Sequence, residues 1–169
     1  MTGLDFCSVV DNAWYTVQEL VLDKVKHTLT IRFTDLASEE EEVFNGEKIK
    51  TAEELDGFLK RFRPACVQLQ DDDCGRMGPG SQVCALLKGK QDEKFYNGLI
   101  YIGLKVDRKP HKQDDCFCKF KVLWTDGPKV GSFETMGMER VCRRKKGSPL
   151  FDPALRSFVR CHKRILIRK

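Results

Sequence analysis

Three side chains that can bind a metal ion lie within eight residues of the sequence: His111, Cys116 and Cys118. Both cysteines belong to a stretch whose residues alternate as in a β-strand, which places the two thiols on the same face. His111 lies in the polar segment just before this stretch, so all three side chains can reach one tetrahedral ion. We therefore expect a zinc ion here; the alternative is two small buried cysteines and a surface histidine.

A structural zinc site needs a fourth ligand, and the expected strand order supplies candidates. If the predicted strands 81–88 and 95–106 pair as an antiparallel hairpin, the start of the first lies beside the end of the second, near the histidine. Cys74 and Cys84 both satisfy this argument, and Cys142 on the last predicted strand is less favoured. Four protein ligands leave no position open for water, so the pattern disfavours a hydrolytic zinc enzyme.

The composition indicates a chain of two small modules. Its 169 residues are 41% hydrophobic and include eight cysteines. Modules of about 70 residues usually need a staple such as a metal ion. The first residues have neither the basic region nor the apolar run of a signal peptide, so we expect a reduced, intracellular and soluble protein rather than a secreted disulfide scaffold.

The charge is unevenly distributed along the chain. Residues 140–169 carry eleven Lys or Arg against one Asp, a net charge of +10, so residues 1–139 carry −5 of the total of +5. A basic segment suits phosphate groups, and an acidic body suits a cationic partner such as a histone tail. A solvated charged surface without a ligand is the alternative for the basic segment.

The first module is expected over residues 8–72. Residues 11–22 and 28–34 predict a hairpin, and 35–42 an acidic loop. A capping-box pattern from Thr51 to Glu54, followed by apolar residues at helical spacing, predicts a helix over 51–62. Residues 65–70 predict a strand that closes this module.

The second module is expected over residues 73–146 and the rest of the chain, 147–169, is a basic extension. An Asp-Pro pair at residues 152 and 153 and a partly apolar stripe predict a helix in that extension. Short strands separated by tight turns argue for a small SH3-like barrel in the second module. These strands are predicted at 81–88, 95–106, 116–125, 130–136 and 140–144.

Taken together, these segments resemble the SAWADEE domain of plant chromatin proteins, over about residues 11 to 146. The resemblance implies a mainly β fold of tandem Tudor-like barrels with one or two helices and with zinc in the second barrel, and it implies Cys74 as the fourth ligand. The residues that carry it are Ala13-Trp14-Tyr15, Ile31-Arg32-Phe33 with the acidic loop, Cys74, Val83, His111 with Cys116 and Cys118, and Val141-Cys142-Arg143-Arg144.

The resemblance also implies a function: a non-enzymatic nuclear reader of a methylated histone tail, in a family associated with RNA-directed DNA methylation. Its methyl-lysine pocket would use Tyr15, Phe33 and a third aromatic, but Leu36 stands at the third position. A leucine lacks the ring quadrupole that attracts a methylated ammonium, so we expect weak tail binding with little preference for methylation.

Two alternatives accompany this expectation. The strand aromatics could be barrel core, as such residues usually are. The module could also have lost methyl-lysine reading and bind nucleic acid through the basic C-terminal segment, or a protein partner in a chromatin complex.

Overall fold

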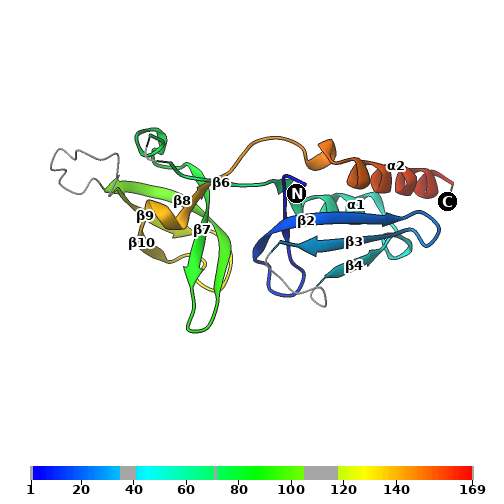
Figure 1. Ribbon diagram of the computed structural model, residues 1–169, viewed down its shortest axis with the longest axis horizontal. Helices are drawn as coiled ribbons and strands as arrows, with labels where there is room; N and C mark the ends of the chain where they lie inside the picture. Colours follow the sequence, from blue (N-terminus) through cyan, green and yellow to red (C-terminus); the bar gives the residue numbers. More distant parts are fainter. Residues whose placement is uncertain (1, 35–40, 71, 105–117, 169) are drawn as a thin grey trace. The chain divides into compact units, whose positions relative to one another are not determined.

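The computed structural model describes residues 2–34, 41–70, 72–104 and 118–168. As the sequence predicts, these residues form mainly β-structure with two α-helices. They gather into two compact units, Met1–Ala65 with Lys146–Lys169, and Cys66–Lys145 (Figure 1). Among the described residues, no helix has the length and apolar character needed to span a membrane.

An antiparallel sheet in the order β4-β3-β2-β1-β5 forms the first unit. The predicted hairpin is confirmed as β2 and β3, whose β-branched and aromatic residues suit a half-buried strand. The sequence analysis did not predict β1, because four residues are too few to show a clear alternation. The strands are β1 (Leu4–Cys7), β2 (Trp14–Asp23), β3 (Thr28–Phe33), β4 (Glu42–Asn45) and β5 (Phe62–Pro64).

The predicted helix is α1 (Ala52–Leu59), which the 3-10 turn η2 (Gly46–Lys48) precedes. Thr51 Oγ1 accepts a hydrogen bond from the backbone N–H of Glu54 at 3.1 Å, as the capping box requires. The prediction that the helix reaches residue 62 is wrong. Phe62 belongs to β5, where pairing with β1 and a ring contact with Phe6, at 4.7 Å between centroids, stabilise the extended backbone.

Helix α2 (Pro153–Ile167) belongs to the first unit, whereas the sequence-based division placed residues 147–169 outside both modules. The short 3-10 turn η5 (Pro149–Phe151) leads into it. Asp152 Oδ1 accepts the backbone N–H of Leu155 at 3.0 Å and caps the helix. Its buried apolar face joins the hydrophobic core of the sheet and α1 through Leu155, Phe158 and Val159.

A pair of buried histidines fixes α2 to the turn between β2 and β3. His27 Nε2 lies 2.9 Å from His162 Nδ1, and His162 Nε2 lies 2.6 Å from the carbonyl oxygen of Ile49. Because a carbonyl only accepts, His162 Nε2 carries the proton, and its Nδ1 accepts from His27 Nε2–H. A Cβ at Gly46 would lie 2.2 Å from the His27 ring, so this contact requires glycine.

The second unit is an antiparallel sheet in the order β6-β11-β7-β8-β9-β10. The five strands predicted after residue 80 are confirmed where the structure describes them, and residues 105–106 and 116–117 of the predicted ranges lie outside the described residues. The prediction that residues 65–70 close the first module is wrong, because β6 pairs with β11. The strands are β6 (Val67–Gln68), β7 (Gln82–Lys88), β8 (Glu93–Leu104), β9 (Lys119–Trp124), β10 (Phe133–Gly137) and β11 (Val141–Arg143).

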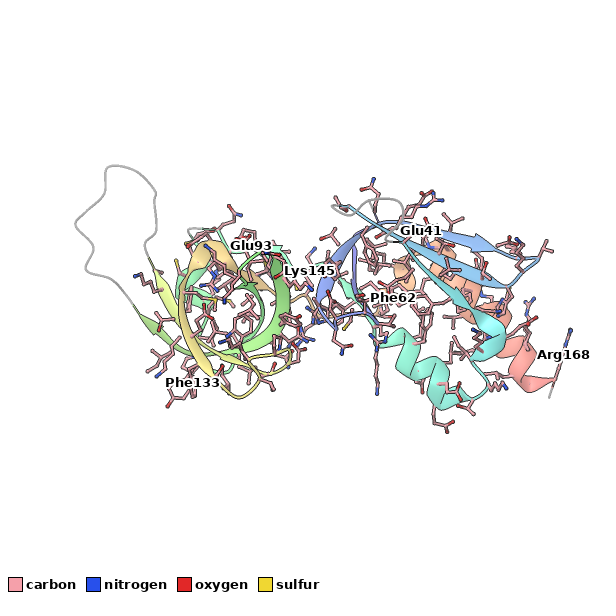
Figure 2. All side chains as sticks on the ribbon, turned by 90° about the horizontal axis from the view of Figure 1, so that it is seen from below. Glu41, Phe62, Glu93, Phe133, Lys145 and Arg168 are labelled. Carbon is pink, nitrogen blue, oxygen red and sulfur yellow. The ribbon has the colours of Figure 1, made fainter. Side chains whose placement is uncertain are left out.

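The sheet of the second unit is curled. A single turn of 3-10 helix, η4 (Met138–Arg140), joins β10 to β11, although β9, β8 and β7 separate them in the sheet order. The two strands can follow each other so closely only if the sheet bends round on itself. Figure 2 shows it wrapped around its side chains. Phe120, Val122 and Trp124 are among the residues buried in this unit.

Candidate functional site

Tyr15 and Phe33, two of the three residues predicted to form a lysine pocket, lie together in the first unit. Val17 is directly opposite Phe33 on the neighbouring antiparallel strand, and Tyr15, two residues earlier, shares its face. The ring centroids are 5.5 Å apart and the ring planes are inclined by 55°. Leu36, the third predicted residue, lies outside the described residues.

The two rings differ in burial. Phe33 is only 7% exposed and belongs to the core with Phe6, at 6.2 Å between ring centroids. Phe44 also packs on Phe6, at 5.6 Å. The alternative interpretation, that strand aromatics form the barrel core, therefore holds for these phenylalanines. Tyr15 is half-buried at the margin of that core and presents the more accessible ring surface of the pair.

Asp11 brings a carboxylate to the Tyr15 ring. Its Oδ1 accepts the backbone N–H of Ala13 at 2.9 Å, and its Oδ2 accepts the Tyr15 hydroxyl. Asn12 supports this tight turn with φ of 57°, a conformation that asparagine tolerates better than most residues. A carboxylate at the edge of an aromatic ring attracts an ammonium group. The sequence analysis placed Asp11 only at the start of the predicted hairpin, and its spacing from Tyr15 gave no sign of the contact.

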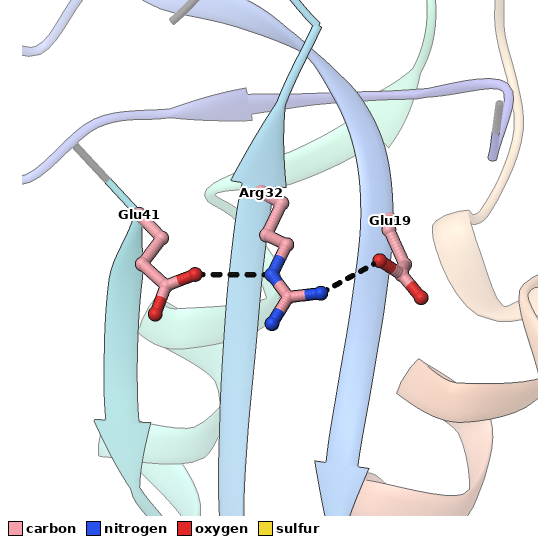
Figure 3. A network of polar contacts seen from close by, with 3 residues as sticks. All are labelled: Glu19, Arg32 and Glu41. Carbon is pink, nitrogen blue, oxygen red and sulfur yellow. Dashed lines mark hydrogen bonds and ion pairs between the residues drawn. The ribbon is translucent and has the colours of Figure 1, made fainter. Parts of the chain in front are cut away.

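Glu41 and Glu42, the described residues of the predicted acidic loop, both accept hydrogen bonds from other parts of the first unit. Arg32 on β3 donates from Nε to Glu41, just before β4, and from Nη1 to Glu19 on β2, each at 3.0 Å (Figure 3). The hydrogen bond with Glu41 raises the pKa of Arg32, and the bond with Glu19 adds a smaller increase. Glu42 accepts the backbone N–H of Val9 at 3.1 Å. Glu41 is thus tied to β3 and Glu42 to the turn after β1, whereas the sequence analysis treated residues 35–42 only as an acidic loop.

Two of the four predicted zinc ligands, His111 and Cys116, lie outside the described residues, whereas Cys74 and Cys118 are described. Within the described part of the chain, no three His, Cys, Asp or Glu residues form a group that could hold a metal. Cys74 begins the 3-10 turn η3 (Cys74–Arg76), and Cys118 is buried immediately before β9. The complete ligand set remains a prediction.

The hairpin on which the choice of the fourth ligand rests is confirmed, because β7 and β8 are antiparallel neighbours. The N–H of Gly80 donates to the carbonyl of Ile100 at 2.7 Å, so the chain before β7 runs beside the second half of β8. Lys119, at the start of β9, is opposite Leu104, at the end of β8. The segments carrying Cys74 and Cys118 thus approach the same end of the sheet.

The other two candidates for the fourth ligand lie elsewhere in the sheet. Cys84 is opposite Asn97 on β8 and opposite Cys142 on β11. Asn97 is seven positions from Leu104, which is the partner of the first residue of β9. That is roughly 20 Å of strand, which is too far for Cys84 or Cys142 to share an ion with the start of β9.

The solvent side of α2 is basic. Arg156, Arg160, Arg164 and Arg168 are exposed at four-residue intervals, which places them along one face of the helix, and Lys163 is exposed beside them. Figure 2 labels Arg168 at the end of this face. Among the described residues, none of these five side chains takes part in an ion pair.

Comparison with known proteins defines the family. The model of the SAWADEE domain matches residues 1–142, so the chain belongs to the SAWADEE domain family. SAWADEE domains are non-catalytic reader domains. The matched residues end before α2, although that helix completes the core of the first unit.

Solved structures of this family share the fold. A selenium-substituted double mutant of the Arabidopsis thaliana SHH1 SAWADEE domain is 20% identical, with a TM-score of 0.61, over 85% of this chain and 96% of that one. The SHH1 SAWADEE domain in complex with an H3K9me3 peptide is also 20% identical, with a TM-score of 0.60, over 84% of this chain and 96% of that one. Among curated proteins, the comparison finds no match.

Proposed function

We propose that this protein is a nuclear, non-enzymatic chromatin reader of two Tudor-like barrels, which binds a histone tail by holding a lysine side chain against Tyr15 in the first unit. The family and the fold shared with a domain bound to an H3K9me3 peptide support this proposal. The observation that carries it is the juxtaposition of the half-buried Tyr15 ring, the Phe33 ring and the Asp11 carboxylate.

The physical argument combines an aromatic surface and a negative charge. An ammonium group over the Tyr15 ring gains roughly 0.5 to 2 kcal/mol from the ring quadrupole. The Asp11 carboxylate adds Coulomb attraction that does not depend on methylation. Because Phe33 is mostly covered by the core and Leu36 has no ring, the pocket has few faces for methyl groups. Binding is therefore weak, with little difference between methylated and unmethylated lysine.

Isothermal titration tests this proposal with histone H3 peptides that carry unmodified or trimethylated lysine. Tyr15→Ala removes the ring and should weaken binding by roughly two- to thirtyfold. Tyr15→Phe keeps the ring and should retain most of the affinity, so it serves as the matched control. If the natural protein binds tightly and Tyr15→Ala binds equally well, the lysine site lies elsewhere and the proposal is wrong.

For the second unit, we propose one structural zinc ion bound by Cys74, His111, Cys116 and Cys118. Support comes from the ligand spacing and from the strand register, which brings the segments of Cys74 and Cys118 to one end of the sheet. Zinc would cross-link that end, since its four protein ligands complete a tetrahedral site. It would supply folding energy and no open position for catalysis.

A second candidate function is binding of a nucleic-acid backbone through α2. The arginines at four-residue intervals favour it, because they form a linear positive face without an ion-pair partner among the described residues. Such contacts would be independent of base sequence and would weaken steeply with salt. A chromatin-complex protein with an acidic surface is the other partner that this face could bind.

A further inference from the structure

An exposed aromatic pair lies on the outer face of the second unit. Tyr101 on β8 is 51% exposed and Phe133 on β10 is 47% exposed. Their ring centroids are 5.0 Å apart with the planes at 64°. Lys121, on the strand between them, places its Nζ 5.5 Å from the Tyr101 centroid and 5.0 Å from the Phe133 centroid. Figure 2 labels Phe133 on the outside of the curled sheet.

Strand register explains why these side chains converge. Thr135 on β10 is opposite Lys121, and Phe133 is two residues away on the same face. On β8 the register shifts between Ile100 and Ile102, so that Tyr101 is an extra residue against β9. Such a bulge redirects a side chain, and bulges are frequent beside functional sites.

These rings add little to the hydrophobic core. The interior of the second unit is filled from the opposite face of the same strands, where Phe120, Val122 and Trp124 are buried. Burial of the outer rings against a ligand would remove apolar surface that remains in contact with water in the free protein. Exposed aromatic side chains that gather on one sheet face indicate a binding surface more often than isolated ones do.

Charge on this face selects the ligand. Of the charged residues that the structure describes, Lys121 places its ammonium group over both rings, so a second cation would have to displace it. Glu134 points away and pairs with Arg140 at 2.6 Å. The carboxylate of Glu139 lies at the other end of the face, where a Cβ at Gly137 would be 2.2 Å from its Oε2. The ligand that fits the rings is thus flat, apolar on its faces and anionic at its edge.

We propose that Tyr101, Phe133 and Lys121 form a binding surface for single-stranded nucleic acid. Unpaired bases stack on the Tyr101 and Phe133 rings, and the Lys121 ammonium leaves the rings to pair with a phosphate. Stacking on protein aromatics requires bases that are not already stacked in a duplex, so this surface discriminates single strands from double strands. The proposal does not depend on the histone-tail function, which uses the first unit.

Fluorescence anisotropy with a short labelled oligothymidylate, and with a duplex of the same length, tests this surface on the full chain. Binding of the single strand should depend on the two rings, whereas any binding of the duplex through α2 should not. Replacing Tyr101 or Phe133 by Ala should each weaken single-strand binding by roughly fivefold or more. Phe151→Ala is the matched control, since Phe151 is 50% exposed in the first unit, and should leave binding unchanged.

Two further variants complete the test. Lys121→Ala should weaken binding and reduce its salt dependence, whereas Lys129→Ala, in the exposed turn before β10, should do neither. Tyr101→Trp should retain binding, and stacking of bases on the new indole should quench its fluorescence. Trp14 and Trp124 are buried, so the change in signal can be assigned to the new tryptophan. Equal affinity of the natural protein and the Tyr101 and Phe133 variants for the single strand would overturn the proposal, as would an equal loss of duplex binding in these variants.

Discussion

Acidification should destabilise the first unit through the histidine pair that holds α2. Burial lowers the pKa of His27, with a further decrease from His162, while Glu47 opposes the shift. An unfolded histidine titrates near its ordinary pKa of 6.5. Between the folded and the unfolded pKa of His27, the unfolded chain binds more protons. This stabilisation is therefore fully present above about pH 6.5 and is lost as the pH falls through that interval.

Proton linkage sets an upper bound on the size of this effect. One proton taken up on unfolding lowers the free energy of unfolding by at most about 1.4 kcal/mol per pH unit. Hydrogen exchange of the amides of α2 at pH values between about 7.5 and 5 measures this slope locally.

His27→Asn provides the control variant. Asparagine tolerates the positive φ of 56° at this position but does not titrate. The variant should be less stable at neutral pH, because it loses the ring stacking with Phe158 at 5.0 Å, and its pH dependence should be flatter. An unchanged slope in His27→Asn, or greater stability of the natural protein at low pH, would refute the reasoning.

Three further predictions concern the other proposed sites. Purified protein should contain one zinc ion per chain, and a chelator should melt the second unit but not the first; absence of zinc by elemental analysis contradicts this. Replacing Arg156, Arg160 and Arg164 by Gln should reduce the salt dependence of duplex binding by about one unit of slope for each arginine that contacts phosphate, and unchanged retention would mean that this face only aids solubility. Leu36→Phe should strengthen binding of a trimethylated peptide by roughly two- to thirtyfold in isothermal titration, and no gain would contradict the incomplete-pocket interpretation.

Charge neutralisation is a better test of α2 than truncation. Phe158 is fully buried in the core of the first unit and packs on Phe58 at 5.6 Å between ring centroids. Loss of a buried phenylalanine costs about 3 to 5 kcal/mol, so removal of the helix would unfold the unit that it completes. A loss of binding after truncation would then say nothing about the basic face.

Alternation and capping patterns predicted most of the local structure. The hairpin of β2 and β3 and the strands of the second unit follow from residues that alternate between core and solvent. The Thr51 cap predicted the start of α1, and an Asp-Pro pair predicted the start of α2. These signals are local, since each depends on residues within one or two turns of chain.

Long-range pairing could not be predicted in the same way. The two-residue strand β6 carries no periodicity, and only its pairing with β11 places it in the second unit. The His27 contact with His162 joins residues 135 positions apart, and no pattern in the sequence indicates it. The convergence of Tyr101 and Phe133 depends on a bulge, which local propensity does not specify.

The candidate lysine site was predicted in part. The resemblance implies a pocket with Tyr15 and Phe33, which fall on the two strands of the predicted hairpin, and their rings do lie side by side. The deep burial of Phe33 and the contact of Asp11 with Tyr15 depend on packing and on a turn conformation. Sequence spacing gives the face of a strand, but it does not give the depth at which a side chain lies beneath its neighbours.

Backbone amide chemical shifts recorded during titration with an H3K9me3 peptide test the central claim most directly, because they locate the bound tail. The account predicts saturable shifts at Ala13, Tyr15 and Thr34 in the first unit, with little change at Lys121, and their loss in Tyr15→Ala. Shifts confined to the second unit, or shifts around residue 15 that persist unchanged in Tyr15→Ala, would contradict it.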